Sequence, residues 1–217
     1  MLLIFDLDDT LIDTTGTILP HRRLEALKAM ADDGFKIEAF DAAIEKFAEI
    51  DAESESGSDA LKKFLGTKEE YFEAGKKSLY DNADFNFPIE TTPKAREILE
   101  KLKKGHTLAL VTYGQKQVQW AKLKKTGLDK GLFSTIVVTQ DSDKGPSYHQ
   151  IFEKYGGKGI VIGDRVKRDL TPAKRLGFTT VQMQWGRGKN GGDHPDVDYA
   201  IEQLEDLLPL LEGKEKI

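Results

Sequence analysis

Short apolar runs alternate with segments of helical periodicity along most of the chain. Five runs, apolar or rich in β-branched residues, predict strands at residues 2–6, 107–112, 134–139, 159–164 and 179–185. Helical patterns separate them, at about residues 92–105, 118–127, 147–155 and 169–176. Nearly continuous apolar strands that alternate with helices are typical of parallel sheets covered on both faces. The pattern therefore predicts an α/β fold with a doubly wound, Rossmann-like parallel sheet.

Residues 14–90 follow a different pattern, which is helical throughout and contains no convincing strand. One apolar helical face is formed by Phe40, Ala43, Ile44, Phe47 and Ala48. Ser58 is the expected N-cap of a short helix that ends at Gly66. Thr67 and Glu70 predict a capping box at the start of the next helix. We therefore expect a helical insertion after the first strand.

The charge changes at the same boundaries as the periodicity. Residues 14–90 hold 10 Lys and Arg against 17 Asp and Glu, whereas the rest of the chain holds 22 against 20. This difference supports two structural units. We predict an α/β catalytic core formed by residues 1–15 and 87–217, and an inserted helical domain formed by residues 16–86.

Composition and net charge exclude several classes of protein. The 217 residues include no cysteine, which rules out disulfides, thiolate metal sites and cysteine nucleophiles. A net charge of −5 gives no basic surface for nucleic acid. No apolar run approaches the roughly 20 residues of a membrane span, and the N-terminus lacks the features of a signal peptide. We expect a soluble, cytoplasmic protein with no nucleic-acid or membrane partner.

Polar residues follow the predicted strands of the sheet. These residues are Asp6 and Asp8, then Thr112, Tyr113 and Gly114, then Lys144, and finally Asp164 and Asp169. Ligands of a doubly wound sheet bind outside the carboxyl ends of its strands, so we expect these side chains to meet at one edge. The glycine-rich segment at 186–195 lacks the G-x-x-x-x-G-K spacing of a phosphate loop and predicts a flexible loop instead.

The residue types at this edge suit Mg²⁺-dependent chemistry at phosphorus. Asp6 and Asp164 offer the hard oxygen ligands that Mg²⁺ prefers, and a carboxylate beside the cation can attack phosphorus to form an aspartyl-phosphate. Thr112, the backbone N–H groups after it and Lys144 would hold the other phosphoryl oxygens. Asp8 would protonate the leaving oxygen and later activate water.

Four motifs resemble those of the haloacid dehalogenase-like hydrolase superfamily. They are DLDDT at 6–10, LVTYG at 110–114, Lys144 before Gly-Pro, and GDRVKRD at 163–169. Position 9 is Asp where glycine is common. In that family a cap domain is inserted between the first two motifs, so the resemblance implies that the helical domain of residues 16–86 is a cap.

The resemblance also implies a role for each residue at the strand ends. Asp6 would be the nucleophile and Asp8 the general acid/base. Mg²⁺ would be bound by Asp6, Asp164 and the backbone carbonyl of Asp8. The substrate phosphate would be bound by Thr112, Tyr113, Gly114 and Lys144, with Asp169 in support of the lysine or of the waters on the metal.

We predict a Mg²⁺-dependent phosphatase that acts on a small phosphorylated metabolite. A phosphomutase of the same fold, which returns the phosphoryl group to its substrate, stays open. A receiver-type signalling module also places acids, Thr and Lys around a phosphorylated Asp. Such a module is a compact domain of about 120 residues, without a cap and without the Asp164 and Asp169 pair, so the length favours an enzyme. The sequence leaves the natural substrate and the oligomeric state open.

Overall fold

The computed structural model describes residues 1–54, 56–128, 131–156, 159–190 and 193–214. Within these residues a six-stranded sheet has the order β3-β2-β1-β4-β5-β6, and every neighbouring pair is parallel. The strands are β1 (Leu2–Phe5), β2 (Thr107–Tyr113), β3 (Thr135–Thr139), β4 (Gly159–Gly163), β5 (Thr179–Met183) and β6 (Tyr199–Ile201). This order confirms the predicted doubly wound α/β fold.

Strand β1 lies at the centre of the sheet, and all four of its residues are buried. Leu3 is in register with Leu108 of β2 on one side and with Ile160 of β4 on the other. The sheet grows from β1 through β2 to β3 in one direction and from β4 outward in the other. The winding therefore reverses between β1 and β4, and a reversal of this kind leaves a crevice outside the carboxyl ends of the two strands.

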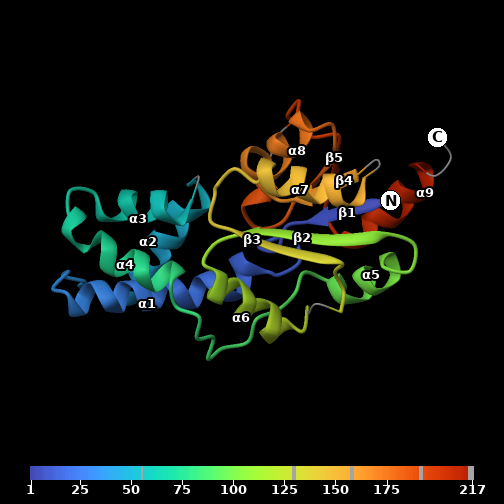
Figure 1. Cartoon of the computed structure of the whole chain (residues 1–217). Helices are drawn as coiled ribbons and strands as arrows, with labels where there is room; N and C mark the ends of the chain where they lie inside the picture. Colours follow the sequence, from blue (N-terminus) through green and yellow to red (C-terminus); the bar gives the residue numbers. More distant parts are fainter. Residues whose placement is uncertain (55, 129–130, 157–158, 191–192, 215–217) are drawn as a thin grey trace. The chain divides into compact units, whose positions relative to one another are not determined.

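Helices cover both faces of the sheet. They are α5 (Ala95–Leu102), α6 (Lys116–Thr126), α7 (Gly145–Tyr155), α8 (Thr171–Arg175) and α9 (Leu207–Lys214). Helices α7 and α8 lie on one face, and α5 and α6 lie on the opposite face (Figure 1). Leu2 and Ile4 of β1 share an apolar cluster with Tyr148 of α7. Because side chains alternate along a strand, Leu3 points toward the opposite face.

Residues 15–88 form a separate compact unit, whereas residues 1–14 and 89–217 form the unit that contains the sheet. The smaller unit consists of α1 (Leu19–Asp32), α2 (Phe40–Ala52), α3 (Gly57–Leu65) and α4 (Phe72–Tyr80), and its described residues form no strand. Helices α1 and α4 pack closely. A Cβ atom on Gly75 of α4 would lie 2.9 Å from Met30 Sδ and 3.1 Å from Leu61.

Two buried arginines of α1 stabilise the helical unit. Arg22 donates to the backbone carbonyls of Asn82 at 2.8 Å and Asp84 at 2.9 Å, which attaches the returning segment of the chain to α1. Arg23 donates to Asp51 of α2 at 2.5 Å, and both side chains of this pair are buried. Arg22 thus joins two parts of the helical unit, and Arg23 compensates the buried carboxylate of Asp51.

The structure corrects two predictions about helix caps. Ser56, and not Ser58, is the N-cap of α3, because its hydroxyl accepts a hydrogen bond from the Asp59 N–H at 3.1 Å and its backbone is extended. No side chain caps the next helical segment, so the predicted capping box at residues 67–70 is wrong. That segment begins with a 3-10 turn, Glu69–Tyr71, which leads directly into α4.

Several other elements differ from their predicted bounds. Helix α5 begins at Ala95 and not at residue 92, because Lys94 has a left-handed φ of 56°. β6 and α9 were not predicted, since a three-residue strand with two exposed residues gives no readable period. Short turns lie at Thr14–Ile18, Val166–Leu170, Gly186–Asn190 and Leu204–Asp206. None of the described helices combines the length and the apolar character that crossing a membrane requires.

Candidate functional site

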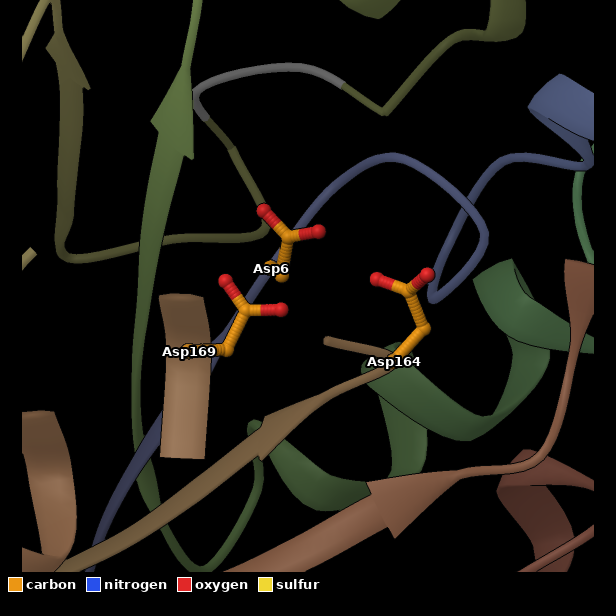
Figure 2. Close-up of side chains that lie close together, drawn as sticks. All are labelled: Asp6, Asp164 and Asp169. Carbon is orange, nitrogen blue, oxygen red and sulfur yellow. The ribbon is translucent and has the colours of Figure 1, made fainter. Parts of the chain in front are cut away.

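Three carboxylates converge in buried positions where the winding of the sheet reverses. Asp6 continues β1, and its N–H donates to the carbonyl of Ile162 on β4 at 2.9 Å. Asp164 directly follows β4, and Asp169 lies in the π-helical turn after it. One oxygen from each of Asp6, Asp164 and Asp169 lies within 4.8 Å of the other two. Figure 2 shows the three side chains gathered close together.

Lys144 forms ion pairs with two of these carboxylates. Its Nζ lies 2.5 Å from Asp6 Oδ1 and 2.7 Å from Asp169 Oδ1, and the side chain is 1% exposed. The other oxygen of Asp169 accepts a hydrogen bond from the Arg165 N–H at 2.9 Å. Burial alone would lower the pKa of Lys144, but Asp169 and Asp6 raise it well above 10.5. Lys144 is therefore a fixed cation between the two acids.

The carboxylates carry more negative charge than Lys144 compensates. Burial raises the pKa of Asp6 to about 7; Lys144 opposes this shift, and Asp169 and Asp8 add to it. Burial also raises the pKa of Asp164, with further contributions from Asp169 and Asp6. A divalent cation would remove this excess charge, and carboxylate oxygens are the ligands that Mg²⁺ prefers. The donor set therefore fits Mg²⁺.

Asp8 is held by three donors from two separate parts of the chain. Its Oδ1 accepts from Thr14 Oγ1 at 2.5 Å and from Lys122 Nζ at 2.6 Å, and its Oδ2 accepts from Gln119 Nε2 at 2.9 Å. Burial alone would raise the pKa of Asp8. The Lys122 ammonium and the three hydrogen bonds outweigh burial and bring the pKa below 3.8. Asp8 is thus an ionised, fully bonded carboxylate.

The turn between β1 and the helical unit is tight and contains an unusual backbone conformation. Asp9 has a φ of 55°, in the left-handed region that most side chains avoid. Its N–H donates to the carbonyl of Ile12 at 2.8 Å, and the N–H of Leu11 donates to the carbonyl of Leu7 at 2.9 Å. Aspartate tolerates this conformation better than most residues. Position 9, where glycine is common, therefore has the left-handed conformation that glycine favours, although its residue is Asp.

The end of β2 brings Thr112 to the same edge of the sheet. Thr112 is fully buried, and its Oγ1 lies 2.6 Å from Gln119 Nε2. Tyr113 is 38% exposed. The N–H of Gly114 donates to the last carbonyl of β3 at 3.0 Å, and a role for Gly114 in phosphate binding stays a prediction. Glycine is favoured there because φ is 145° and a Cβ atom would lie 3.4 Å from the Gln119 amide.

The glycine-rich segment after β5 packs against the site. Residues Gly186–Asn190 form a 3-10 turn, whereas 191 and 192, part of the predicted flexible loop, fall outside the described residues. A Cβ atom on Gly188 would lie 2.5 Å from the carbonyl of Met183 and 3.1 Å from that of Asp164. The absence of a side chain at Gly188 therefore allows this turn to support the backbone that carries Asp164.

Sequence reasoning did not identify Gln119 and Lys122. Both lie on α6, and the side chains are nearly buried, with exposures of 2% and 8%. Residues three apart on a helix share a face, and here that face also contains the buried Val118 and Leu123. Two polar residues at inward positions of an otherwise apolar face were the available signal. Because α6 contains several other lysines, this signal was not recognised in the sequence.

Comparison with known proteins gives a consistent result. A sequence profile of the haloacid dehalogenase-like (HAD) hydrolase family matches residues 1–177. A glyceraldehyde 3-phosphate phosphatase from Methanocaldococcus jannaschii is 29% identical, over 99% of this chain and 98% of that protein. A solved structure of a HAD phosphatase from Thermococcus onnurineus is 25% identical with a TM-score of 0.63, over 98% of both chains. The putative HAD-hydrolase YfnB from Bacillus subtilis is 18% identical with a TM-score of 0.67, over 97% of both chains.

Proposed function

The chain belongs to the haloacid dehalogenase-like hydrolase family, and we propose that it is a phosphatase that uses Asp6 as its nucleophile. One observation carries the proposal. At the reversal point of the sheet, Asp6 lies among buried acids and is paired with the buried Lys144, and Asp8 follows two residues later. This arrangement supplies a nucleophile, a cation for the phosphoryl oxygens and a second acid for proton transfer.

Asp6, Asp164 and the backbone carbonyl of Asp8 would hold Mg²⁺ in this proposal. The raised pKa values of Asp6 and Asp164 support it, because burial and the neighbouring carboxylates both disfavour the charged form, and a cation would compensate these charges. When bound, Mg²⁺ neutralises the carboxylates and polarises the phosphoryl group so that an anionic substrate can approach. Asp169 is already paired with Lys144 and a backbone N–H, so we assign it to the support of that lysine.

The proposed reaction has two steps, and the second returns the enzyme to its starting state. An oxygen of Asp6 attacks phosphorus, and the bond from phosphorus to the leaving oxygen breaks. Asp8 is ionised in the free protein, so it first takes up a proton from solvent when the substrate binds, and it gives this proton to the leaving oxygen. Water then attacks the aspartyl-phosphate, Asp8 takes the proton from water, and inorganic phosphate leaves. The proton on Asp8 serves the next leaving group. Thr112 and Lys144 donate to the phosphoryl oxygens that do not react.

We propose a small phosphorylated metabolite as the substrate, with glyceraldehyde 3-phosphate as the first compound to test. The names of the curated relatives support this choice. We also propose that the helical unit, residues 15–88, is a cap that excludes water and selects the substrate. Residues 14–90 carry 17 acidic against 10 basic residues, and this excess of negative charge disfavours polyanionic substrates.

The proposal is tested by the release of inorganic phosphate from glyceraldehyde 3-phosphate and from p-nitrophenyl phosphate, with Mg²⁺ and with excess EDTA. Turnover should require Mg²⁺, and Asp6→Asn should abolish it for both substrates because no phosphoenzyme can form. Asp32→Asn, which changes an exposed carboxylate of α1, is the matched control and should leave turnover unchanged. Full activity in EDTA, or turnover by Asp6→Asn, would reject the assignment.

The role of Asp8 is tested by the same two substrates, because their leaving groups differ. Asp8→Asn should slow phosphorylation of the enzyme by glyceraldehyde 3-phosphate about 10²–10⁴-fold, the usual value of general acid catalysis. p-Nitrophenolate leaves as a stable anion, so a burst of it should appear before hydrolysis of the phosphoenzyme stalls. An equal loss of the first step with both substrates would contradict the role of Asp8.

A further inference from the structure

We propose that Gln119 and Lys122 of α6 are positioning residues that hold the acid/base Asp8 and the phosphate-binding Thr112 in one rigid frame. This inference rests on the proposed function and deepens it. The two side chains lie 111 and 114 residues from Asp8 in the sequence, yet both contact its carboxylate directly. Neither belongs to the four motifs that identify the family.

The Gln119 amide joins two functional groups that come from different strands. Its Nε2 lies 2.9 Å from Asp8 Oδ2, 2.6 Å from Thr112 Oγ1 and 2.9 Å from the carbonyl of Tyr113. Carboxylate and carbonyl oxygens only accept, which fixes the orientation of the amide. The amide has two hydrogens for three acceptors, so one of them is shared between two acceptors. The Thr112 oxygen thus accepts from this nitrogen, and its own hydrogen is available to donate to a phosphoryl oxygen. Gln119 thus orients the hydroxyl of Thr112 as well as the carboxylate of Asp8.

Lys122 and Gln119 together prevent rotation of the Asp8 carboxylate. Lys122 Nζ binds Oδ1, the oxygen that also accepts from Thr14, while Gln119 binds Oδ2. Lys122 is only 8% exposed, and a buried ammonium is costly unless it is paired. With donors from two helical positions on its two oxygens, the carboxylate has one orientation. A group that transfers a proton to the leaving oxygen and later takes one from water must be held in one orientation.

The backbone beside Thr112 leaves room for this arrangement. At Gly114 a Cβ atom would lie 3.4 Å from Cδ and Nε2 of Gln119, and the φ of 145° also disfavours other residues. Gln119 itself is 2% exposed. The positive φ is the main reason for glycine here, and the turn that it forms lies against the amide that contacts both Thr112 and Asp8.

The experiment compares Lys122→Met and Gln119→Met with Lys125→Met, which changes an exposed lysine of the same helix. Lys122→Met should slow phosphorylation of the enzyme by glyceraldehyde 3-phosphate about 10²-fold, the typical cost of a misplaced catalytic group. Its KM and its burst with p-nitrophenyl phosphate should change little. Gln119→Met should also raise KM, because Thr112 loses its orientation. Lys125→Met should match the wild type, and Lys122→Arg should recover part of the rate.

A double variant separates positioning from a general structural role. If Lys122 acts through Asp8, then Lys122→Met in an Asp8→Asn background should cost no more than about twofold, since the two effects are coupled. Full additivity of the two substitutions, or an equal loss with both substrates, would overturn the inference. Thermal unfolding checks that each variant is folded. If Lys122→Met does not fold, the rate of Lys122→Arg tests the positioning role instead.

The same variants distinguish a failure of this inference from a failure of the proposed function. If Asp6→Asn and Asp8→Asn behave as expected while Lys122→Met and Gln119→Met match Lys125→Met, only the positioning role is wrong. If Asp6→Asn keeps its turnover, the phosphatase assignment itself is wrong. The same set of proteins and the same two substrates distinguish these outcomes.

Discussion

The clustered carboxylates should make the metal-free protein less stable as the pH rises. Burial raises the pKa of Asp6 from 3.8 to about 7. Between these two values the unfolded chain has lost the Asp6 proton while the folded protein still holds it, so a rising pH favours unfolding. The stabilisation is complete below about pH 3.8 and is lost as the pH passes about 7. At about 1.4 kcal/mol per pKa unit, the shift corresponds to about 4 kcal/mol.

This amount is a large fraction of the free energy of unfolding of a typical domain, which is roughly 5–15 kcal/mol. Asp164 adds to it in the same direction, because burial, Asp169 and Asp6 raise its pKa too. Mg²⁺ should counteract the loss at high pH, since it binds the ionised carboxylates of the folded protein. The site thus lowers the stability of the metal-free protein in order to hold a cation.

Urea unfolding followed by far-UV circular dichroism, at pH 4 and pH 8 in EDTA, measures the effect. Asp6→Asn is the informative variant, because it keeps the shape of the side chain and removes this titration. It should match the wild type near pH 4 and exceed its free energy of unfolding by up to about 4 kcal/mol at pH 8. Equal pH dependence in the two proteins, or a less stable Asp6→Asn at pH 8, would refute the reasoning.

Two further predictions concern packing in the two units. Gly188→Ala should lower the stability by about 1–3 kcal/mol and weaken the apparent affinity for Mg²⁺, because its Cβ atom would lie 3.1 Å from the Asp164 carbonyl. Thermal unfolding and Mg²⁺ titration measure both effects. The control is Gly105→Ala, whose Cβ atom would meet no atom within 4 Å. Arg23→Met should destabilise the helical unit by about 3–5 kcal/mol, because the buried carboxylate of Asp51 loses its cation. Hydrogen exchange should then rise first in residues 15–88, and unchanged protection there would contradict this prediction.

The sequence by itself determined the fold class and the elements that carry the candidate site. Continuous apolar runs such as residues 159–164 are a local property of the chain, and a parallel sheet is the arrangement that buries them on both faces. The parallel arrangement in turn places the carboxyl ends at one edge, so the sequence was enough to expect Asp6, Asp164 and Lys144 together. The structure brings these three side chains together, and their catalytic roles stay predictions.

Only the tertiary structure decided which side chains complete that edge. The contacts of Asp8 with Gln119 and Lys122 join residues more than 100 positions apart, and the periodicity of α6 carries no information about what its inward polar residues meet. Two other errors were local: Ser56 and Ser58 are both plausible caps in sequence, and only the hydrogen bond from the Asp59 N–H to Ser56 distinguishes them. The strand β6 was missed because three residues give no readable period. A sequence pattern records what each segment prefers locally. The distance between side chains on different elements is set by how those elements pack, and at this site packing fixes the surroundings of Asp8.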